Sequence, residues 1–145
     1  MKKTDQLDKV ALIKDIQEKE ASRNLADDNS RHENLQMQLA KLTAYREEYE
    51  ERLNNNINEM KSANALQDYH NFIRVLDSAI KEQQQAIFEC SRQLQISRNR
   101  WTNSRSEVKQ VETLREKVER QNREEAARQE QKTSDEMSAN RHRDE

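Results

Sequence analysis

The chain has 145 residues, of which 32% are hydrophobic and 37% are charged, and its formal net charge at pH 7 is -2. So little apolar material excludes a compact domain with a thick core, and the near balance of charges argues against general attraction to nucleic acid. Glycine and proline are both absent, so the chain lacks the residues that most often interrupt helices. The composition is typical of long helices with large solvent-exposed faces.

A first helix is predicted over residues 4–58. Its apolar pattern is clear at both ends but becomes polar over residues 17–34, and an isolated helix this polar is weak, so it needs a partner. The stripe expected to face that partner comprises Leu7, Val10, Ile13 and Ile16 at one end and Leu35, Leu39, Leu42, Tyr49, Leu53 and Met60 at the other, with Arg46 and Asn56 as polar interruptions.

A turn is predicted at residues 59–64. Five asparagines fall between positions 54 and 64, and asparagine is the residue that best replaces glycine in turns. Asn64, followed three residues later by Gln67, fits the N-cap of the next helix. A short turn joins antiparallel neighbours, so the chain is expected to fold back on itself here.

The second helix, predicted over residues 65–133, carries the clearest pattern of the chain. Sixteen positions follow an unbroken alternation of three and four residues, and twelve of them are apolar. This period is typical of a supercoiled helix with one narrow apolar stripe. The stripe comprises Leu66, Tyr69, Ile73, Leu76, Ile80, Gln83, Ile87, Cys90, Leu94, Ser97, Trp101, Ser104, Val108, Val111, Arg115 and Val118.

Folding the chain at the predicted turn pairs residues whose numbers add up to about 122. This register places Leu53 by Tyr69, Tyr49 by Ile73, Leu42 by Ile80, Leu35 by Ile87, and Ile13 by Val108. The polar middle of the first helix then faces residues 90–104, where we expect the weakest pairing. The two helices carry opposite charges in this part, and these charges determine the register more than they stabilise the helix pair. The second helix contributes Arg92, Arg98, Arg100, Arg105 and Lys109, and the first helix contributes Asp15, Glu18, Glu20, Asp27 and Asp28.

The predicted fold is all-α: one coiled-coil domain over residues 1–145, a long two-helix antiparallel coiled-coil hairpin with a charged C-terminal extension. Residues after position 118 are nearly all polar, and residues 134–145 are predicted to be a flexible tail. Asp5, Asp8 and Lys9 interrupt any signal-peptide core, and no segment is long and apolar enough to span a bilayer. We therefore expect an intracellular protein without a transmembrane segment.

No arrangement of residues indicates catalysis. His32, His70 and His142 lie in different parts of the chain, whereas a zinc site needs at least three ligands, and a phosphate-binding loop needs glycine. The single cysteine, Cys90, lies on the apolar stripe and is expected to be a small buried residue. We expect no enzyme activity, no cofactor and no metal site.

Several apolar residues lie beside the stripes. Phe72, Val75, Ala79 and Ala86 form a ridge along the second helix, and Tyr45 precedes the stripe position occupied by Arg46. Two interpretations remain open at this point. The residues broaden the packed stripe of the hairpin itself, or they form an exposed patch that another protein covers.

This ordered series resembles the flagellar FliJ protein family, small components of the bacterial flagellar type III secretion apparatus. The resemblance covers nearly the whole chain, although relatives often carry glycine in the turn where this chain has asparagine. It rests on Leu39, Leu42, Tyr45, Glu48, Tyr49, Leu53, Tyr69, Phe72, Ile73, Leu76, Ala79, Ile80, Trp101, Leu114, Gln131, Lys132, Asp135 and Glu136.

The resemblance implies a stalk-like coupling factor, similar to the central stalk of rotary ATPases. Such a protein binds the hexameric export ATPase (FliI), contacts the export gate protein FlhA and handles export chaperones, in the cytoplasm at the inner face of the cell membrane, at the flagellar base. The gate contact maps onto Gln38, Leu42, Tyr45, Tyr49, Phe72, Leu76 and Ala79. The ATPase ring is expected to meet charged residues near the termini: Arg115, Lys117, Arg120, Arg123 and Arg128.

Three alternatives remain open from the sequence: the equivalent stalk of a virulence injectisome, a parallel homodimeric coiled-coil spacer, and a helical protein that binds nucleic acid through residues 92–109. Sedimentation distinguishes a hairpin monomer of 17.3 kDa from a dimer. Salt-dependent retention of DNA would identify the nucleic-acid-binding protein.

Overall fold

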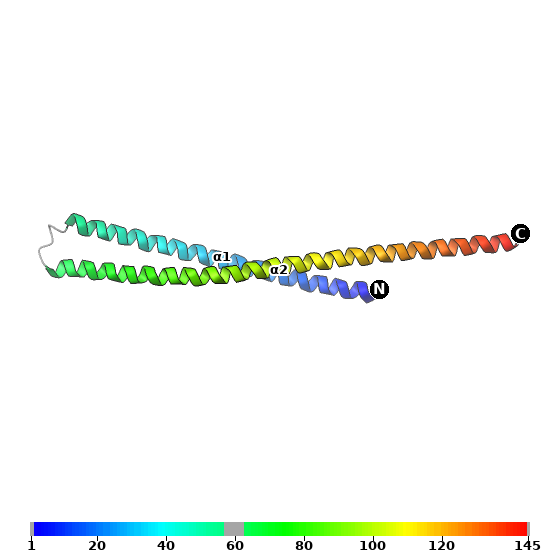
Figure 1. Cartoon of the computed structure of the whole chain (residues 1–145), viewed down its shortest axis with the longest axis horizontal. Coiled ribbons are helices and arrows are strands. Elements are labelled where there is room, and N and C mark those ends of the chain that lie inside the picture. The colour runs from blue at the N-terminus through cyan, green and yellow to red at the C-terminus, as the bar shows by residue number, and fades with distance from the viewer. Residues whose placement is uncertain (1, 57–62, 145) are drawn as a thin grey trace. The chain divides into compact units, whose positions relative to one another are not determined.

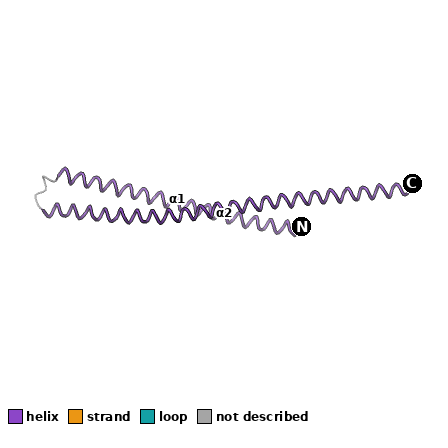
Figure 2. Tube along the Cα trace, in the orientation of Figure 1, coloured by secondary structure: helices purple, strands orange, loops and turns teal. Residues whose placement is uncertain are grey.

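A computed structural model of the chain describes residues 2–56 and 63–144, and all of them are helical (Figure 2). Helix α1 spans Lys2–Asn56 and helix α2 spans Ala63–Asp144 (Figure 1). The helices pair side by side in opposite directions, which confirms the predicted all-α antiparallel coiled-coil hairpin. Each helix runs without a break because no residue in it removes a backbone donor or adds the flexibility of glycine.

The helix ends differ from those predicted. Helix α2 begins at Ala63, so Asn64 lies within its first turn and is not the N-cap. The same helix continues to Asp144, whereas the sequence analysis ends it at residue 133 and follows it with a flexible tail. Side-chain pairs one turn apart, such as Gln131 with Asp135 at 3.1 Å, support this continuation. Met60 and most of the predicted turn lie outside the described residues.

The packing divides the chain into two units, which are described separately. The middle unit is Ala21–Trp101, and the terminal unit combines Met1–Glu20 with Thr102–Glu145. Every buried residue of the described chain belongs to the middle unit, and these are Asp28, Leu53, Leu76, Cys90, Leu94 and Ser97. In the described part of the terminal unit, the stripe residues are only partly buried.

The predicted stripe of α2 is confirmed. All sixteen of its positions are buried or partly buried. The predicted register is confirmed too, because contacts between the helices join residues whose numbers add up to between 117 and 125, on both sides of the predicted sum of about 122. Examples are Lys14 with Glu107 at 3.0 Å, His32 with Ser91 at 2.9 Å, and Arg115 with Asp8 at 2.8 Å.

The predicted stripe at the start of α1 is wrong after Leu7. Val10, Ile13 and Ile16 are 39%, 52% and 57% exposed. Each step of three residues falls about 60° short of a full helical turn, so three such steps carry the pattern to the far side of the helix. The stripe instead keeps its alternation of three and four through Ala11, Lys14 and Glu18. Ile13 therefore does not face Val108, and Lys14 bonds to Glu107 in this part of the hairpin.

The polar middle, where the sequence predicts the weakest pairing, contains four of the six buried residues of the described chain. Asp28, Cys90, Leu94 and Ser97 lie there and are 3% to 7% exposed. Three of these residues are small or polar, and Asp28 contacts both Cys90 and Ser97 across the two helices. Ser97 donates a hydrogen bond to the Asp28 carboxylate, so a serine meets this acid in place of one of the expected basic residues.

Candidate protein-interaction surfaces

An aromatic cluster of Tyr45, Tyr49, Tyr69 and Phe72 joins α1 to α2 in the middle unit. The centroid of the Tyr49 ring lies 4.4 Å from that of Phe72 and 5.4 Å from that of Tyr69. Tyr45 lies 5.5 Å from Tyr49 and 6.2 Å from Phe72 by the same measure. These separations are in the range of favourable aromatic pairs, so the rings support one another in fixed positions.

The cluster is covered on one side only. Tyr45 is 47% exposed and Val75, on the neighbouring ridge of α2, is 62% exposed, whereas Tyr49 and Phe72 are partly buried. Both interpretations of the ridge therefore hold in part. Phe72, with Ala79 and Ala86, widens the packed stripe, while Tyr45 and Val75 present apolar surface to solvent.

The seven residues that the sequence assigns to a gate contact differ in access to solvent. Leu76 is only 6% exposed and belongs to the core of the hairpin. Gln38 is exposed and accepts a hydrogen bond of 3.1 Å from Gln83, which also donates to the Leu35 carbonyl oxygen. Tyr45 is also exposed, whereas Leu42, Tyr49, Phe72 and Ala79 are partly buried.

Arg46 holds the two helices together beside the cluster. Its guanidinium donates to the Asp77 carboxylate on α2 and, at 2.8 Å, to Glu50 on α1. The hydrogen bond to Asp77 raises the pKa of Arg46 above its usual value, so the guanidinium stays charged. The sequence analysis treated Arg46 only as an interruption of the stripe. The signal that identifies its role is the acid Asp77 on α2, opposite Arg46 in the predicted register.

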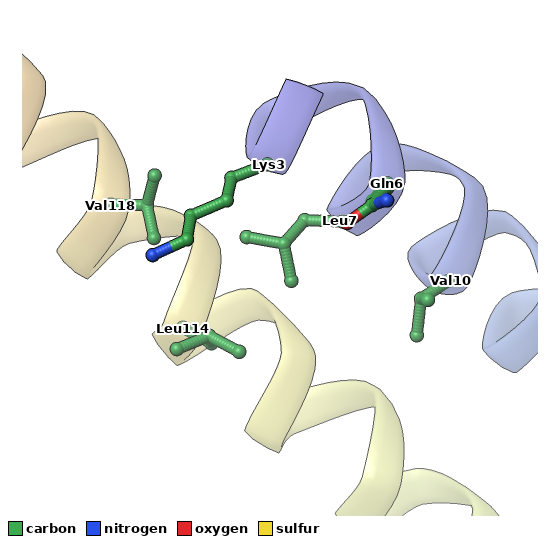
Figure 3. Close-up of a pocket in the computed structure, with 6 residues that line it drawn as sticks. All are labelled: Lys3, Gln6, Leu7, Val10, Leu114 and Val118. Carbon is green, nitrogen blue, oxygen red and sulfur yellow. The ribbon is translucent and has the colours of Figure 1, made fainter. Parts of the chain in front are cut away.

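A second apolar surface lies on α1 in the terminal unit. Leu12 is 61% exposed, and Val10, Ile13 and Ile16 are exposed near it. Val10 also borders a cavity of about 380 Å³ between the helices, shown in Figure 3, where Leu7 points between Lys3 and Val10 toward α2. The cavity is lined by Lys3, Gln6, Leu7, Val10, Leu114 and Val118. The alternation of three and four residues, followed from Leu35 toward the N-terminus, leaves Val10, Leu12, Ile13 and Ile16 outside the stripe. The sequence therefore contains the signal for this surface.

The five cationic residues assigned to an ATPase ring differ in exposure and in their partners. Arg115 is partly buried and pairs with Asp8 across the helices at 2.8 Å. Arg128 lies 3.8 Å from Glu125 of its own helix, and Lys117, Arg120 and Arg123 are exposed. All described residues from position 119 onward are exposed, which confirms a charged C-terminal extension.

Residues 2–56 and 63–144 contain no group of three histidine, cysteine, aspartate or glutamate residues that could hold a metal ion. Cys90 is a buried free thiol, as predicted. Neither described helix has a stretch apolar and long enough to cross a membrane.

Comparison with known proteins identifies the family. The sequence profile of the family described as "Flagellar FliJ protein" matches residues 2–145. The chain belongs to this family. The flagellar FliJ protein of Escherichia coli (strain K12) is 28% identical over 111 residues, which cover 74% of this chain and 76% of that relative. No solved structure matches the chain. As a member of the FliJ family, the chain is a flagellar export component.

Proposed function

We propose that the chain is a stalk-like coupling factor of flagellar protein export. In this role it binds the hexameric export ATPase (FliI) and the export gate protein FlhA and handles export chaperones, without catalysing a reaction. It acts in the cytoplasm at the inner face of the cell membrane, at the base of the flagellum. Membership of the FliJ family and the continuous helical hairpin support this proposal.

The observation that carries the gate contact is the one-sided exposure of the aromatic cluster. Tyrosine and phenylalanine are large, rigid residues that dominate the energetics of many protein interfaces. Here Tyr45 is held by ring contacts to Tyr49 and Phe72 while almost half of it remains exposed. Little conformational entropy is lost when such a side chain binds, and this favours the cluster as the contact for FlhA.

The terminal unit is our candidate for the contact with the ATPase. It contains the exposed charged extension of α2, with Lys117, Arg120 and Arg123 accessible to a partner. Exposed ion pairs contribute only about 0–1 kcal/mol each, so contacts of this kind form and break at little cost as ring subunits change shape.

The gate contact is tested by measuring the affinity of the purified full chain for the soluble part of FlhA. We expect Tyr45→Ala to weaken binding by about tenfold or more, which corresponds to about 1.4 kcal/mol, with little change in melting temperature because the ring is half exposed. Met37→Ala is the matched control, because Met37 is 56% exposed on α1 but has no place in the cluster. Equal affinities of the wild type and the Tyr45 variant would reject the cluster as the gate contact.

A further inference from the structure

A buried carboxylate lies in the seam between the helices of the middle unit. Asp28 is 7% exposed, and its carboxylate accepts a hydrogen bond from the hydroxyl of Ser97, which is 3% exposed. Arg31, one turn along α1, lies 3.3 Å from the same carboxylate. The Cys90 thiol lies 3.9 Å from the Asp28 carbonyl oxygen and completes the layer.

The seam is not as stable as it could be with an apolar residue in place of Asp28. Position 28 belongs to the stripe of α1, between Leu25 on one side and His32 and Leu35 on the other. A leucine there would extend the apolar seam, whereas a carboxylate in such a place loses hydration that its partners must replace. A buried polar group in a coiled coil is best understood through the pairings that it permits and excludes.

The pairing that Asp28 excludes is that of α1 with a second copy of α1. In a parallel pair of identical helices, equal positions of the stripe face each other, so two Asp28 carboxylates would meet in the seam. Neither can donate a hydrogen bond to the other when ionised. In the antiparallel hairpin, the same side chain meets the hydroxyl donor of Ser97.

We propose that the buried Asp28 carboxylate, by disfavouring an α1–α1 pair, directs α1 to α2 of its own chain and keeps the protein monomeric. The rest of the α1 stripe would favour self-association, since Leu25, Leu35, Leu39 and Leu42 follow the heptad on either side of this layer. In the hairpin, the buried Asp28 carboxylate has the Ser97 hydroxyl as a donor across the seam. In an α1–α1 pair it would face a second carboxylate, and the donor that remains would be Arg31 on its own helix. This specificity is independent of which export proteins the hairpin binds.

The test is sedimentation equilibrium of the full chain over a wide concentration range, with helicity monitored by circular dichroism. We expect wild type at 17.3 kDa at all concentrations, and Asp28→Leu at roughly twice that mass as concentration rises. His32→Leu is the matched control, because it adds the same side chain one turn along the same stripe and leaves Asp28 in place. It should remain monomeric. Ser97→Ala removes the donor but keeps the charge, and should remain monomeric with a lower melting temperature.

Three results would overturn the proposal. A folded Asp28→Leu variant that sediments as a monomer at every concentration would show that pairing is determined elsewhere. Dimerisation of His32→Leu to the same extent as Asp28→Leu would show that apolar content alone controls association. A dimeric wild type would show that Asp28 does not prevent association at all.

Discussion

The middle unit and the terminal unit use the same two helices but pack them differently. The middle unit contains all the buried residues of the described chain, two of which are the polar Asp28 and Ser97. The terminal unit has Val10, Leu12, Ile13 and Ile16 within seven positions, yet each of them is exposed. Burial in a two-helix hairpin therefore depends on whether a residue falls on the stripe, and the local amount of apolar sequence does not decide it.

The stripe residues of the terminal unit explain the difference. On α1 they are Ala11, Lys14 and Glu18, which are small or charged. Val108 and Val111 of α2 therefore have little apolar surface to pack against. Ion pairs between partly exposed groups replace that packing, as in Lys14 with Glu107. We expect the middle unit to supply most of the stability and the terminal unit to keep surface available for partners.

The largest effect on stability is expected from Leu94→Ala in the middle unit. Leu94 is 6% exposed, so its truncation leaves a cavity and should lower the free energy of unfolding by about 2–5 kcal/mol. Leu114→Ala in the terminal unit removes the same atoms from a side chain that is 46% exposed, and should cost much less. Urea or thermal unfolding measures both. Equal losses would contradict the comparison of the two units.

Removal of the chain after Val118 should separate function from stability. Every described residue beyond this point is exposed, so we expect the melting temperature to change little and FlhA binding to persist. Stimulation of the export ATPase should fall, because the exposed cationic residues after Val118, among them Arg120 and Arg123, are lost. The assay compares ATPase rates with full-length and truncated protein at matched concentrations. Undiminished stimulation would exclude the extension as the ATPase contact.

A smaller effect is expected from improving the stripe of the terminal unit. Lys14→Leu replaces a partly buried charged residue on the stripe, and should raise the free energy of unfolding by about 1 kcal/mol. The reason is that burial of a leucine side chain stabilises the fold more than the partly exposed ion pair of Lys14 with Glu107 does. Ile13→Leu, next to it but off the stripe, should change nothing measurable. A stabilisation by Ile13→Leu, or none by Lys14→Leu, would show that the heptad does not define burial here.

The sequence predicts the architecture well because its strongest signal is periodic. The structure confirms the sixteen-position stripe of α2 and the register of the hairpin. Both were predictable because they depend on residue spacing. The start of α1 was misjudged because Val10, Ile13 and Ile16 are attractive core residues at a spacing of three, which a helix cannot keep on one side. The polar seam at Asp28 could not be evaluated from composition, because its burial depends on a specific donor, Ser97, across the helices.

The candidate surfaces were only partly predictable for similar reasons. Tyr45 and Phe72 stood out because a stripe does not require them, and the structure places their rings 6.2 Å apart between centroids. The burial of Leu76 depends on how closely the helices approach, and the sequence does not specify that distance. The role of Arg46 was predictable, because Asp77 lies opposite it in the predicted register and Glu50 lies one turn along α1.

Residue-resolved hydrogen exchange tests most directly the claim that stability is concentrated in the middle unit. Amides that open only with global unfolding exchange slowest, and those in weakly packed segments exchange sooner. We predict the strongest protection around Asp28 on α1 and over residues 90–97 on α2, with faster exchange over residues 3–20 and 102–144. Uniform protection along both helices, or earliest opening around Asp28 and Ser97, would contradict the account.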